Sequence, residues 1–513
     1  MKKLITLLFF VILTITTYAQ GAPFVTRWNL SYPGFDNDRI NLNLSITDTV
    51  TYSWQELSPG NDSGFGIFTS NYENVMGLPP GSIIRLSIDS ANINSLVIGA
   101  SSSRSRLIDI ESWGSMNWTS MYKAFVGCNY MNISATNIPN ISGLTDMSHA
   151  FSACDLLTGP INISSWNTAQ VTSMFDLFYK ATNFNQPIGS WNTSAVTNMR
   201  SVFSEASIFN QDISNWNTAS VYEMAEMFAY TNKFNKPIGD WITDSVHFMQ
   251  GMFRGAVSFN QPLGNWNTLL VENMGLMFCG AIAFNQSIGN WQTASVTDMR
   301  GMFSSAKVFN QPLDNWNTAE VRDMAYMFAG ATAFNQTLGN WTLNSNVILT
   351  SMLDTCGLDC NNYSNTLIGW AANPNTPNGR TLGALNMQYN AAGAAARATL
   401  ISKGWTITGD APSTDPAQCL STIGITDPTT LESLQLSPNP FTNHINLSLA
   451  APTASTLQVS ISNTLGQIVY VKQEQIASGL HNQTIILDNI PAGIYMVKVA
   501  LGNRSATNKL VHY

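Results

Sequence analysis

Charged side chains are scarce in this chain of 513 residues. Lysine, arginine, aspartate and glutamate together make up 11% of it, the formal net charge is −8, and the sequence pI is about 5.1. Binding to nucleic acid draws much of its free energy from lysine and arginine side chains that displace counterions from the phosphate backbone. The composition therefore excludes nucleic acid from the partners that we expect.

Histidine and cysteine, which often hold metals or act in catalysis, are also rare. The five histidines lie far apart, and the sequence contains no HExxH, GxSxG or P-loop motif and no zinc-type cysteine pair. We therefore expect a protein that is not an enzyme, with no catalytic residue, no metal site and no cofactor. The six cysteines are too few for a disulfide framework in a chain of this length, and the sequence leaves their pairing open. They are Cys128, Cys154, Cys279, Cys356, Cys360 and Cys419.

Long apolar runs are absent after the first 19 residues. No later stretch reaches the roughly 18 apolar residues of a membrane-spanning helix, so we expect no transmembrane helix in the mature chain. The shorter run from Leu4 to Ile15 follows two lysines and precedes the small-residue site Thr17-Tyr18-Ala19. This order predicts a secretory signal peptide at residues 1–19, with cleavage between Ala19 and Gln20.

Tryptophan recurs at a constant interval of 25 residues through the middle of the chain. The eight copies are Trp166, Trp191, Trp216, Trp241, Trp266, Trp291, Trp316 and Trp341. Methionine and phenylalanine keep the same interval, as in the pairs Met199/Phe203 and Met224/Phe228. This regularity predicts an array of about ten stacked turns over residues 107–345, in which each turn packs mainly on its neighbours.

One copy of the repeat predicts a strand and a helix. The apolar residues between Val196 and Ala206 have the spacing of one helix face, with Thr193 or Ser194 as the N-cap. The segment Ile188 to Trp191 lies between proline and glycine residues, is too short for a helix, and predicts a strand. Stacked copies then give an α/β solenoid of strand-loop-helix turns with a parallel sheet along one side.

Two invariant columns of the repeat each have a binding and a structural interpretation. The asparagines from Asn185 to Asn335 form either a binding stripe or a ladder that satisfies the turns, and the ladder is favoured. The tryptophans offer either sugar stacking or a packed core, and the core is favoured. Cys128, Cys154 and Cys356 occur where other copies carry alanine, which predicts small core residues.

The pair of residues before each methionine varies from copy to copy. Positions that are free to vary are predicted to face solvent, where they determine which partner binds. The candidate binding surface consists of Tyr222, Glu223, His247, Phe248, Glu272, Arg322 and Asp323.

The segments on either side of the array lack its period. Residues 20–106 contain β-type runs such as Ile83 to Ile88 and predict an N-terminal β domain or entry cap. Residues 346–409, with an alanine-rich helix predicted at 391–403, are expected to cap the other end.

The last hundred residues predict a linker and a further module. Residues 410–433 are rich in proline, threonine, serine and aspartate, a composition typical of an exposed linker. Residues 434–513 alternate apolar and polar side chains with period two, as at Leu457, Val459 and Ile461. This pattern predicts a β-sandwich.

The repeat text resembles that of BspA-like leucine-rich-repeat surface proteins, a family that Bacteroidota share with mycoplasma surface antigens. The resemblance rests on Phe-Asn-Gln-Pro-Ile-Gly-Ser-Trp-Asn-Thr at residues 184–193 and on its copies over roughly residues 107–345. It implies a right-handed, leucine-rich-repeat-like solenoid. Relatives of the repeat are implicated in adhesion to host proteins or to other cells.

The tail resembles the type A C-terminal sorting domain of type IX secretion. The matching residues are Pro438, Asn439, Pro440, Gly466, Gly493, Tyr495 and Lys509. The resemblance implies Sec-dependent passage to the periplasm, export by the type IX secretion machinery, and a location outside the cell or on its surface.

The leading functional hypothesis is a surface-displayed adhesion or protein-interaction scaffold. Its expected partners are proteins or glycans of host or neighbouring cells. Two alternatives stay open. One is a carbohydrate-binding or glycan-processing accessory protein, which needs exposed tryptophans and two carboxylates within reach of each other. The other is a structural biofilm component without a specific ligand.

Overall fold

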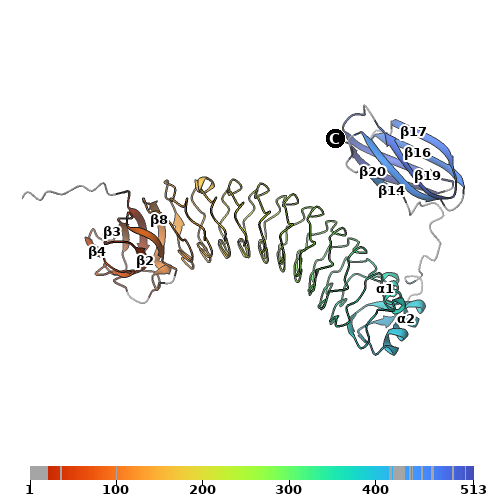
Figure 1. Cartoon of the computed structure of the whole chain (residues 1–513), viewed down its shortest axis with the longest axis horizontal. Helices are drawn as coiled ribbons and strands as arrows, with labels where there is room; N and C mark the ends of the chain where they lie inside the picture. Colours follow the sequence, from red (N-terminus) through yellow and green to blue (C-terminus); the bar gives the residue numbers. More distant parts are fainter. Residues whose placement is uncertain are drawn as a thin grey trace, which may run out of the picture. The chain divides into compact units, whose positions relative to one another are not determined.

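The chain divides into two compact units, which comprise residues 1–419 and 420–513 of the computed structural model (Figure 1). The described residues are 21–34, 37–99, 101–414, 419, 434–437, 441, 443–451, 454–463, 467–487, 490–502 and 504–512. The predicted signal peptide and its cleavage site at Ala19 and Gln20 lie outside them. Neither of the two α-helices within these residues combines the length and the apolarity of a membrane span.

The first unit begins with two β-sheets, and the larger one includes two strands after residue 106, where the predicted β domain ends. The larger sheet has the strand order β4-β3-β6-β1-β8-β9 and the smaller one the order β5-β2-β7. The strands are β1 (Phe24–Asn29), β2 (Ile40–Ile46), β3 (Val50–Ser58), β4 (Ser63–Phe68), β5 (Tyr72–Val75), β6 (Ile83–Ile88), β7 (Ile93–Val97), β8 (Leu107–Trp113) and β9 (Asn132–Ile133). The β-type run at residues 83–88 is confirmed as β6. Strand β8 joins this domain to the array, because it pairs antiparallel with β1 and parallel with β9.

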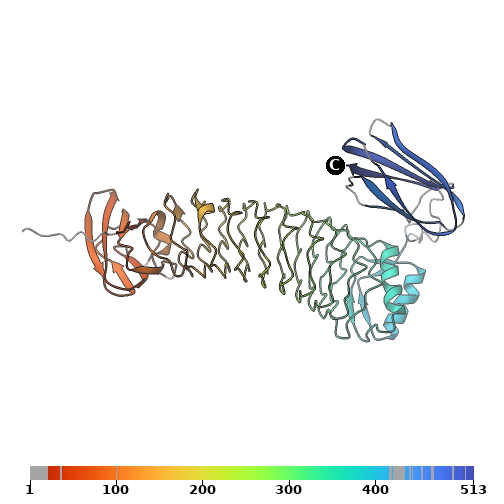
Figure 2. The same cartoon turned by 45° about the horizontal axis from the view of Figure 1, so that its top comes forward.

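Stacked coils of 25 residues follow, and they meet along parallel β-bridges (Figure 2). Most of these bridges join the residue before a methionine to its equivalent in the next coil, as between Asn198 and Glu223. The predicted strand at residues 188–191 is wrong, because these residues form a turn in which Trp191 N donates to Ile188 O at 3.1 Å. At this part of the coil, side chains rather than strand pairing join the neighbours.

The predicted helix at residues 196–206 is wrong as well. The segment is a series of turns in which Ser201 and Glu205 have left-handed φ angles of 53° and 61°. A left-handed residue cannot continue a right-handed helix. Alternate N–H groups instead donate to the following coil, as from Met199 N to Glu223 O at 2.9 Å. The same two positions are left-handed in each coil of the array, so the whole segment pairs outward along the stack.

Aromatic rings form the core of the array, as predicted. Phe203 stacks on Phe228 with ring centroids 5.8 Å apart, and Trp191 stacks on Trp216 at 6.5 Å. The eight tryptophans of the 25-residue series are at most 3% exposed. One continuous hydrophobic core extends from the N-terminal sheets to the residues after the array. Each coil is therefore stabilised by contacts with both neighbours.

Two helices and four short strands cap the array. They are α1 (Cys360–Ala372), β10 (Thr381–Gly383), β11 (Gln388–Tyr389), α2 (Ala391–Ser402), β12 (Thr406–Thr408) and β13 (Ala411–Pro412). The predicted alanine-rich helix is confirmed as α2, which has Asn390 as its N-cap. A linker beginning at residue 410 is wrong, because β13 pairs with β11 and Arg397 binds Asp410 at 2.8 Å.

The second unit consists of two antiparallel sheets around one core. Their strand orders are β14-β15-β18 and β17-β16-β19-β20. The strands are β14 (Gln435–Ser437), β15 (His444–Ala451), β16 (Ser455–Asn463), β17 (Ile468–Ile476), β18 (Gly479–Ile486), β19 (Gly493–Leu501) and β20 (Arg504–His512). The predicted alternation is confirmed, because Leu457, Val459 and Ile461 of β16 are all buried.

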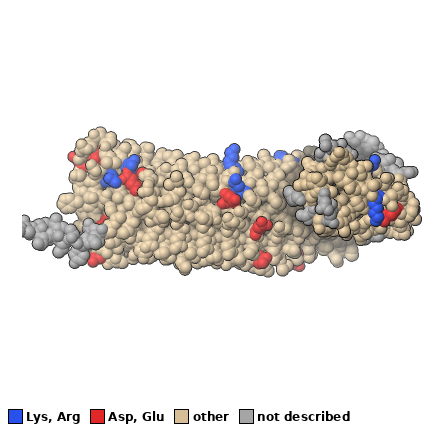
Figure 3. Space-filling view, turned by 90° about the horizontal axis from the view of Figure 1, so that it is seen from above, with Lys and Arg blue, Asp and Glu red and all other residues tan. Residues whose placement is uncertain are grey.

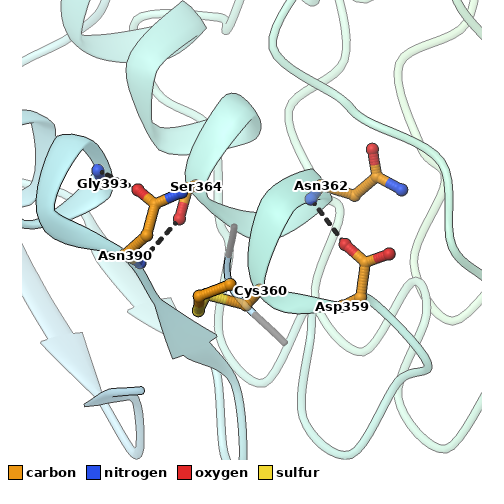
Figure 4. The surroundings of a disulfide bond; sticks show 7 residues. Asp359, Cys360, Asn362, Ser364, Asn390 and Gly393 are labelled. Carbon is orange, nitrogen blue, oxygen red and sulfur yellow. Dashed lines mark hydrogen bonds between the residues drawn. A yellow bond between two sulfur atoms is a disulfide. The ribbon is translucent and has the colours of Figure 1, made fainter. Parts of the chain in front are cut away.

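A single disulfide bond is present among the described cysteines, between Cys360 and Cys419 (Figure 4). Cys360 is the first residue of α1, whose N-cap Asp359 accepts a hydrogen bond from Asn362 N at 2.8 Å. Helix α2 begins nearby at its own N-cap, Asn390 (Figure 4). The disulfide therefore ties the end of the first unit to the start of a capped helix.

The other four cysteines are free thiols. Cys128 and Cys154 are fully buried and Cys356 is 8% exposed, which confirms them as small core residues. Cys279 is half-buried. Burial raises the pKa of all four thiols, and it raises the pKa of Cys356 to about 11.

Alkylation of the native protein is expected to modify Cys279 alone among the four free cysteines. The thiolate is the reactive form, so a thiol reacts at about pH 8 only where solvent and reagent reach it. Mass spectrometry after iodoacetamide treatment should show one adduct on the folded protein and four on the protein unfolded without reductant. Modification of Cys128 or Cys154 at the rate of Cys279 would contradict the packing of these coils.

Candidate interaction surface on the repeat array

The asparagine column is a hydrogen-bonded ladder, in agreement with the favoured interpretation. The side-chain oxygen of Asn235 accepts hydrogen bonds from Asn260 N at 3.0 Å and from Gln261 Nε2 at 2.9 Å. The Asn-to-Asn link recurs from Asn185 through Asn335. These amide oxygens already join one coil to the next, so they are poor candidates for binding a ligand.

The tryptophans of the repeat also join one coil to the next. The indole N–H of Trp216 donates to Ile188 O at 3.0 Å, and Trp191 to Trp341 all make the corresponding bond. Their burial excludes sugar stacking on this column. A binding surface on the array must therefore be built from the residues that differ between copies.

Each variable pair has an outer position, two residues before the methionine, and an inner position, directly before the methionine. The outer residues Tyr222, Glu272 and Arg322 are exposed, and His247 is half-buried. Their main chains pair from coil to coil, as from His247 N to Tyr222 O at 3.0 Å. This pairing holds the outer side chains in register along the stack.

The inner residues are not the free solvent positions that were expected. Glu223, Phe248 and Asp323 are half-buried and carry the β-bridges between coils. The side chain of Glu223 accepts a hydrogen bond from Ala225 N at 2.8 Å and thereby closes the turn that follows. Burial raises the pKa of Glu223. The inner position therefore has a structural role that limits which residues it accepts.

Four of the seven predicted surface residues lie together. The ring of Tyr222 is 4.6 Å from the ring of His247 and 5.4 Å from that of Phe248, and His247 Nδ1 lies 2.9 Å from Glu272 Oε1. The three rings form one aromatic cluster, and the carboxylate of Glu272 lies at its end. Arg322 and Asp323 belong to a coil two repeats after Glu272 and do not join this cluster.

A second group of variable side chains lies at the left-handed positions or directly beside them, and sequence reasoning misses it. Tyr179 donates a hydrogen bond to Glu205 at 3.0 Å, and Lys180 lies 3.7 Å from the same carboxylate. One coil further on, the guanidinium of Arg254 lies 5.4 Å from the ring of Tyr230. Tyr230 is exposed, whereas Tyr179, Glu205 and Arg254 are half-buried. Tyrosine and arginine are enriched at protein interfaces.

Near the start of the array, burial shifts the pKa values of a histidine and an aspartate that lie within ion-pair distance of each other. His149 Nδ1 lies 3.3 Å from Asp176 Oδ2, and the ring of Phe175 packs 4.7 Å from that of His149. Burial is the largest influence on both groups, lowering the pKa of His149 and raising the pKa of Asp176. Each group therefore favours its neutral form more than it does in water.

Few charges are visible on the face shown in Figure 3, where lysine, arginine, aspartate and glutamate form small separate groups. No group of three or more histidine, cysteine, aspartate or glutamate residues in the described part of the chain has the geometry to hold a metal ion. The described surface can make aromatic contacts and hydrogen bonds, together with a few isolated ion pairs.

The predicted sorting-motif residues of the second unit are only partly described. Pro438, Asn439, Pro440 and Gly466 lie outside the described residues. Gly493 opens β19, and Tyr495 is 3% exposed with its hydroxyl donating to Pro491 O at 2.6 Å. Lys509 is exposed on β20. The described motif residues therefore lie on two neighbouring strands, which pair antiparallel.

Two known families match the chain, one over the repeat array and one over the second unit. The family described as "Mycoplasma protein of unknown function, DUF285" matches residues 119–218, 187–270 and 259–366, which together cover most of the array and the start of its cap. The array is a DUF285 repeat domain. This result confirms the resemblance to BspA-like surface repeats. No curated protein matches the chain.

The DUF285 repeats are followed by a match to the family described as "Secretion system C-terminal sorting domain" at residues 435–512. This domain directs type IX secretion to the cell surface or exterior, which confirms the expected localisation. Such a domain implies that the chain interacts with the secretion machinery. The DUF285 repeats are thus part of a secreted surface protein.

Proposed function

We propose that the DUF285 repeats act as an adhesion or protein-interaction scaffold that binds without catalysis. We also propose that the array is a right-handed, leucine-rich-repeat-like solenoid and that the tail is a β-sandwich. The single observation that carries the functional proposal is that different residues of each coil have different roles. The invariant asparagine and tryptophan residues stack the coils, while the outer residues of the variable pairs are held in register at the surface.

The best-defined patch on that surface is the cluster Tyr222, His247, Phe248 and Glu272. Tyrosine in particular supplies contact area at a low cost in conformational entropy, which favours it in protein-binding surfaces. The carbohydrate alternative needs exposed tryptophans, and those of the array are buried. A protein partner therefore fits the described surface better than a glycan does.

Replacement of this cluster by residues from neighbouring coils is expected to weaken adhesion at least about tenfold, a difference of about 1.4 kcal/mol. The variant carries Tyr222→Thr, His247→Thr, Phe248→Asn and Glu272→Thr. Thr197 and Asn198 occupy the outer and inner positions in an adjacent coil, so the array should keep its packing. Binding of labelled collagen, fibronectin and laminin, and of whole cells, to the immobilised mature chain provides the measurement.

A matched control changes surface residues elsewhere on the same coils, of which Ile242 and Leu269 are exposed and Lys236 is half-buried. Lys236→Gln, Ile242→Asn and Leu269→Ala also introduce the residues found at these positions in other copies, such as Gln186, Asn192 and Ala219. The control should bind as the unaltered protein does. Equal binding by the two variants would remove the cluster as the site of adhesion.

A further inference from the structure

Strand β4 lies at the free edge of the larger N-terminal sheet. The strand order places β3 on one side of it and no described strand on the other, and it is labelled at the margin of this domain in Figure 1. Its sequence is Ser63-Gly-Phe-Gly-Ile-Phe68. Such an edge presents unpaired N–H and C=O groups on which another strand can form a ladder.

The register identifies which main-chain groups are unpaired. Glu56 N donates to Asp62 O at 2.8 Å, and the pairing of β3 with β4 continues from there without a bulge. In an antiparallel ladder, alternate residues point their main-chain groups toward the partner strand. Gly64 and Gly66 therefore bond to β3, while the N–H and C=O groups of Phe65 and Ile67 point away from the sheet.

The same two residues have the most exposed apolar side chains of the strand. Phe65 is 90% exposed and Ile67 is 60% exposed. On the opposite face, the glycines are covered by aromatic rings of β3, because a Cβ added at Gly64 would lie 2.6 Å from the indole nitrogen of Trp54. One face of β4 is therefore packed, and the other carries an uncovered phenylalanine and isoleucine beside an open hydrogen-bonding edge.

The edge lacks the devices that keep sheet edges apart. Natural edge strands are protected by lysine, proline, bulges or inward-pointing charge. Residues 63–72 contain no lysine, arginine, aspartate, glutamate or proline, and β4 has no bulge against β3. With a net charge of −8, two copies of this chain repel each other over most orientations, but an uncharged edge meets no such opposition.

The edge is also complementary to itself. A strand that pairs antiparallel with its own copy is related to it by a two-fold axis, so the same donors and acceptors serve both partners. Such pairing near Gly66 would place Phe65 and Ile67 of both copies on one face of the joined sheet. There they would cover one another as cross-strand pairs.

We propose that β4 is the dimerisation edge of this protein and that its occupant is β4 of a second copy. The two larger sheets then join into one continuous sheet. Main-chain hydrogen bonds from Phe65 and Ile67 supply the contact, and their side chains make it apolar. The pairing brings together two chains, each with its own repeat array. It is independent of whether the array binds a partner.

Sedimentation velocity of the mature chain, from about 1 to about 100 µM, tests the proposal over the range in which a small interface associates. The unaltered protein should pass from monomer to dimer. Phe65→Lys adds a charge to the edge, and Phe65→Pro removes one outward N–H without touching the ladder to β3, a position where edge strands accept proline. Both variants should dissociate at least about tenfold more readily.

Ile161→Lys is the matched control, since Ile161 is 87% exposed and lies outside the N-terminal sheets. It should dimerise as the unaltered chain does. Hydrogen exchange at residues 63–68 should slow as concentration rises in the unaltered chain and in the control only. A chain that stays monomeric over this range would overturn the proposal. A dimer that both Phe65 variants leave intact would overturn it as well.

Discussion

Replacing Trp241 with alanine is expected to lower the free energy of unfolding of the first unit by about 3 to 5 kcal/mol. The side chain is 3% exposed, and its ring lies 6.5 Å from that of Trp216 and 6.2 Å from that of Phe228. Its indole N–H donates to Ile213 O at 3.2 Å. Alanine leaves a cavity in the middle of the stack and removes the donor to that carbonyl. Urea unfolding followed by circular dichroism provides the measurement.

Two phenylalanine variants separate the volume of the indole from its hydrogen bond. Trp166 is as buried as Trp241, but no partner for its Nε1 is found among the described residues. Trp241→Phe should therefore cost about 1 kcal/mol more than Trp166→Phe, since only the first loses a hydrogen bond. Equal losses would show that the bond adds nothing. A loss below about 1 kcal/mol for Trp241→Ala would contradict the core role of the column.

The 25-residue period predicted which side chains are inside the array, but not the path of the main chain. Val196, Met199, Val202, Phe203 and Ala206 are all buried, as the expected helix face requires. The same spacing is also satisfied by turns in which every fourth residue is left-handed. Non-glycine residues rarely adopt such angles, so Ser201 and Glu205 gave no sign of them.

A signal for these turns is present in later copies of the repeat. Glycine occurs at the two left-handed positions as Gly251, Gly255, Gly280, Gly301 and Gly330. Glycine that recurs at a fixed offset within a predicted helix indicates a left-handed turn instead, because only glycine adopts that region without strain. The same signal would have placed a second group of variable residues on the surface.

The sequence correctly predicted the outer residues of the candidate surface, but not the structural role of the inner ones. Variation between copies correctly located the outer residues, such as Tyr222 and Glu272, because their side chains are exposed and many residue types fit there. Variation also occurs at the inner position, although Glu223 closes a turn there. Asparagine and aspartate can make the same bond, as at Asn273 and Asp323, so different residues fulfil one structural role.

The pairing of the cysteines could not be derived from the sequence, since six cysteines allow many combinations. The chain folds so that Cys360 and Cys419, which are 59 residues apart, come together through the cap. Replacing Cys360 with serine is expected to destabilise the cap. The chain-entropy argument for a loop of this length gives a loss of about 4 kcal/mol. Guanidinium unfolding under non-reducing conditions, monitored by hydrogen exchange in α1 and α2, would measure it.

Cys356→Ala is the matched control for that experiment, because it removes a thiol near the cap without opening the disulfide. Alanine occupies the same position in most coils, as at Ala206 and Ala331, so the control should lose no more than about 1.5 kcal/mol. If Cys360→Ser were as stable as this control, the crosslink would contribute nothing to the cap. A secreted protein meets an oxidising environment in which such a bond persists. The same substitution should therefore lower the amount of protease-resistant protein recovered outside the cell, whereas the control should leave it unchanged.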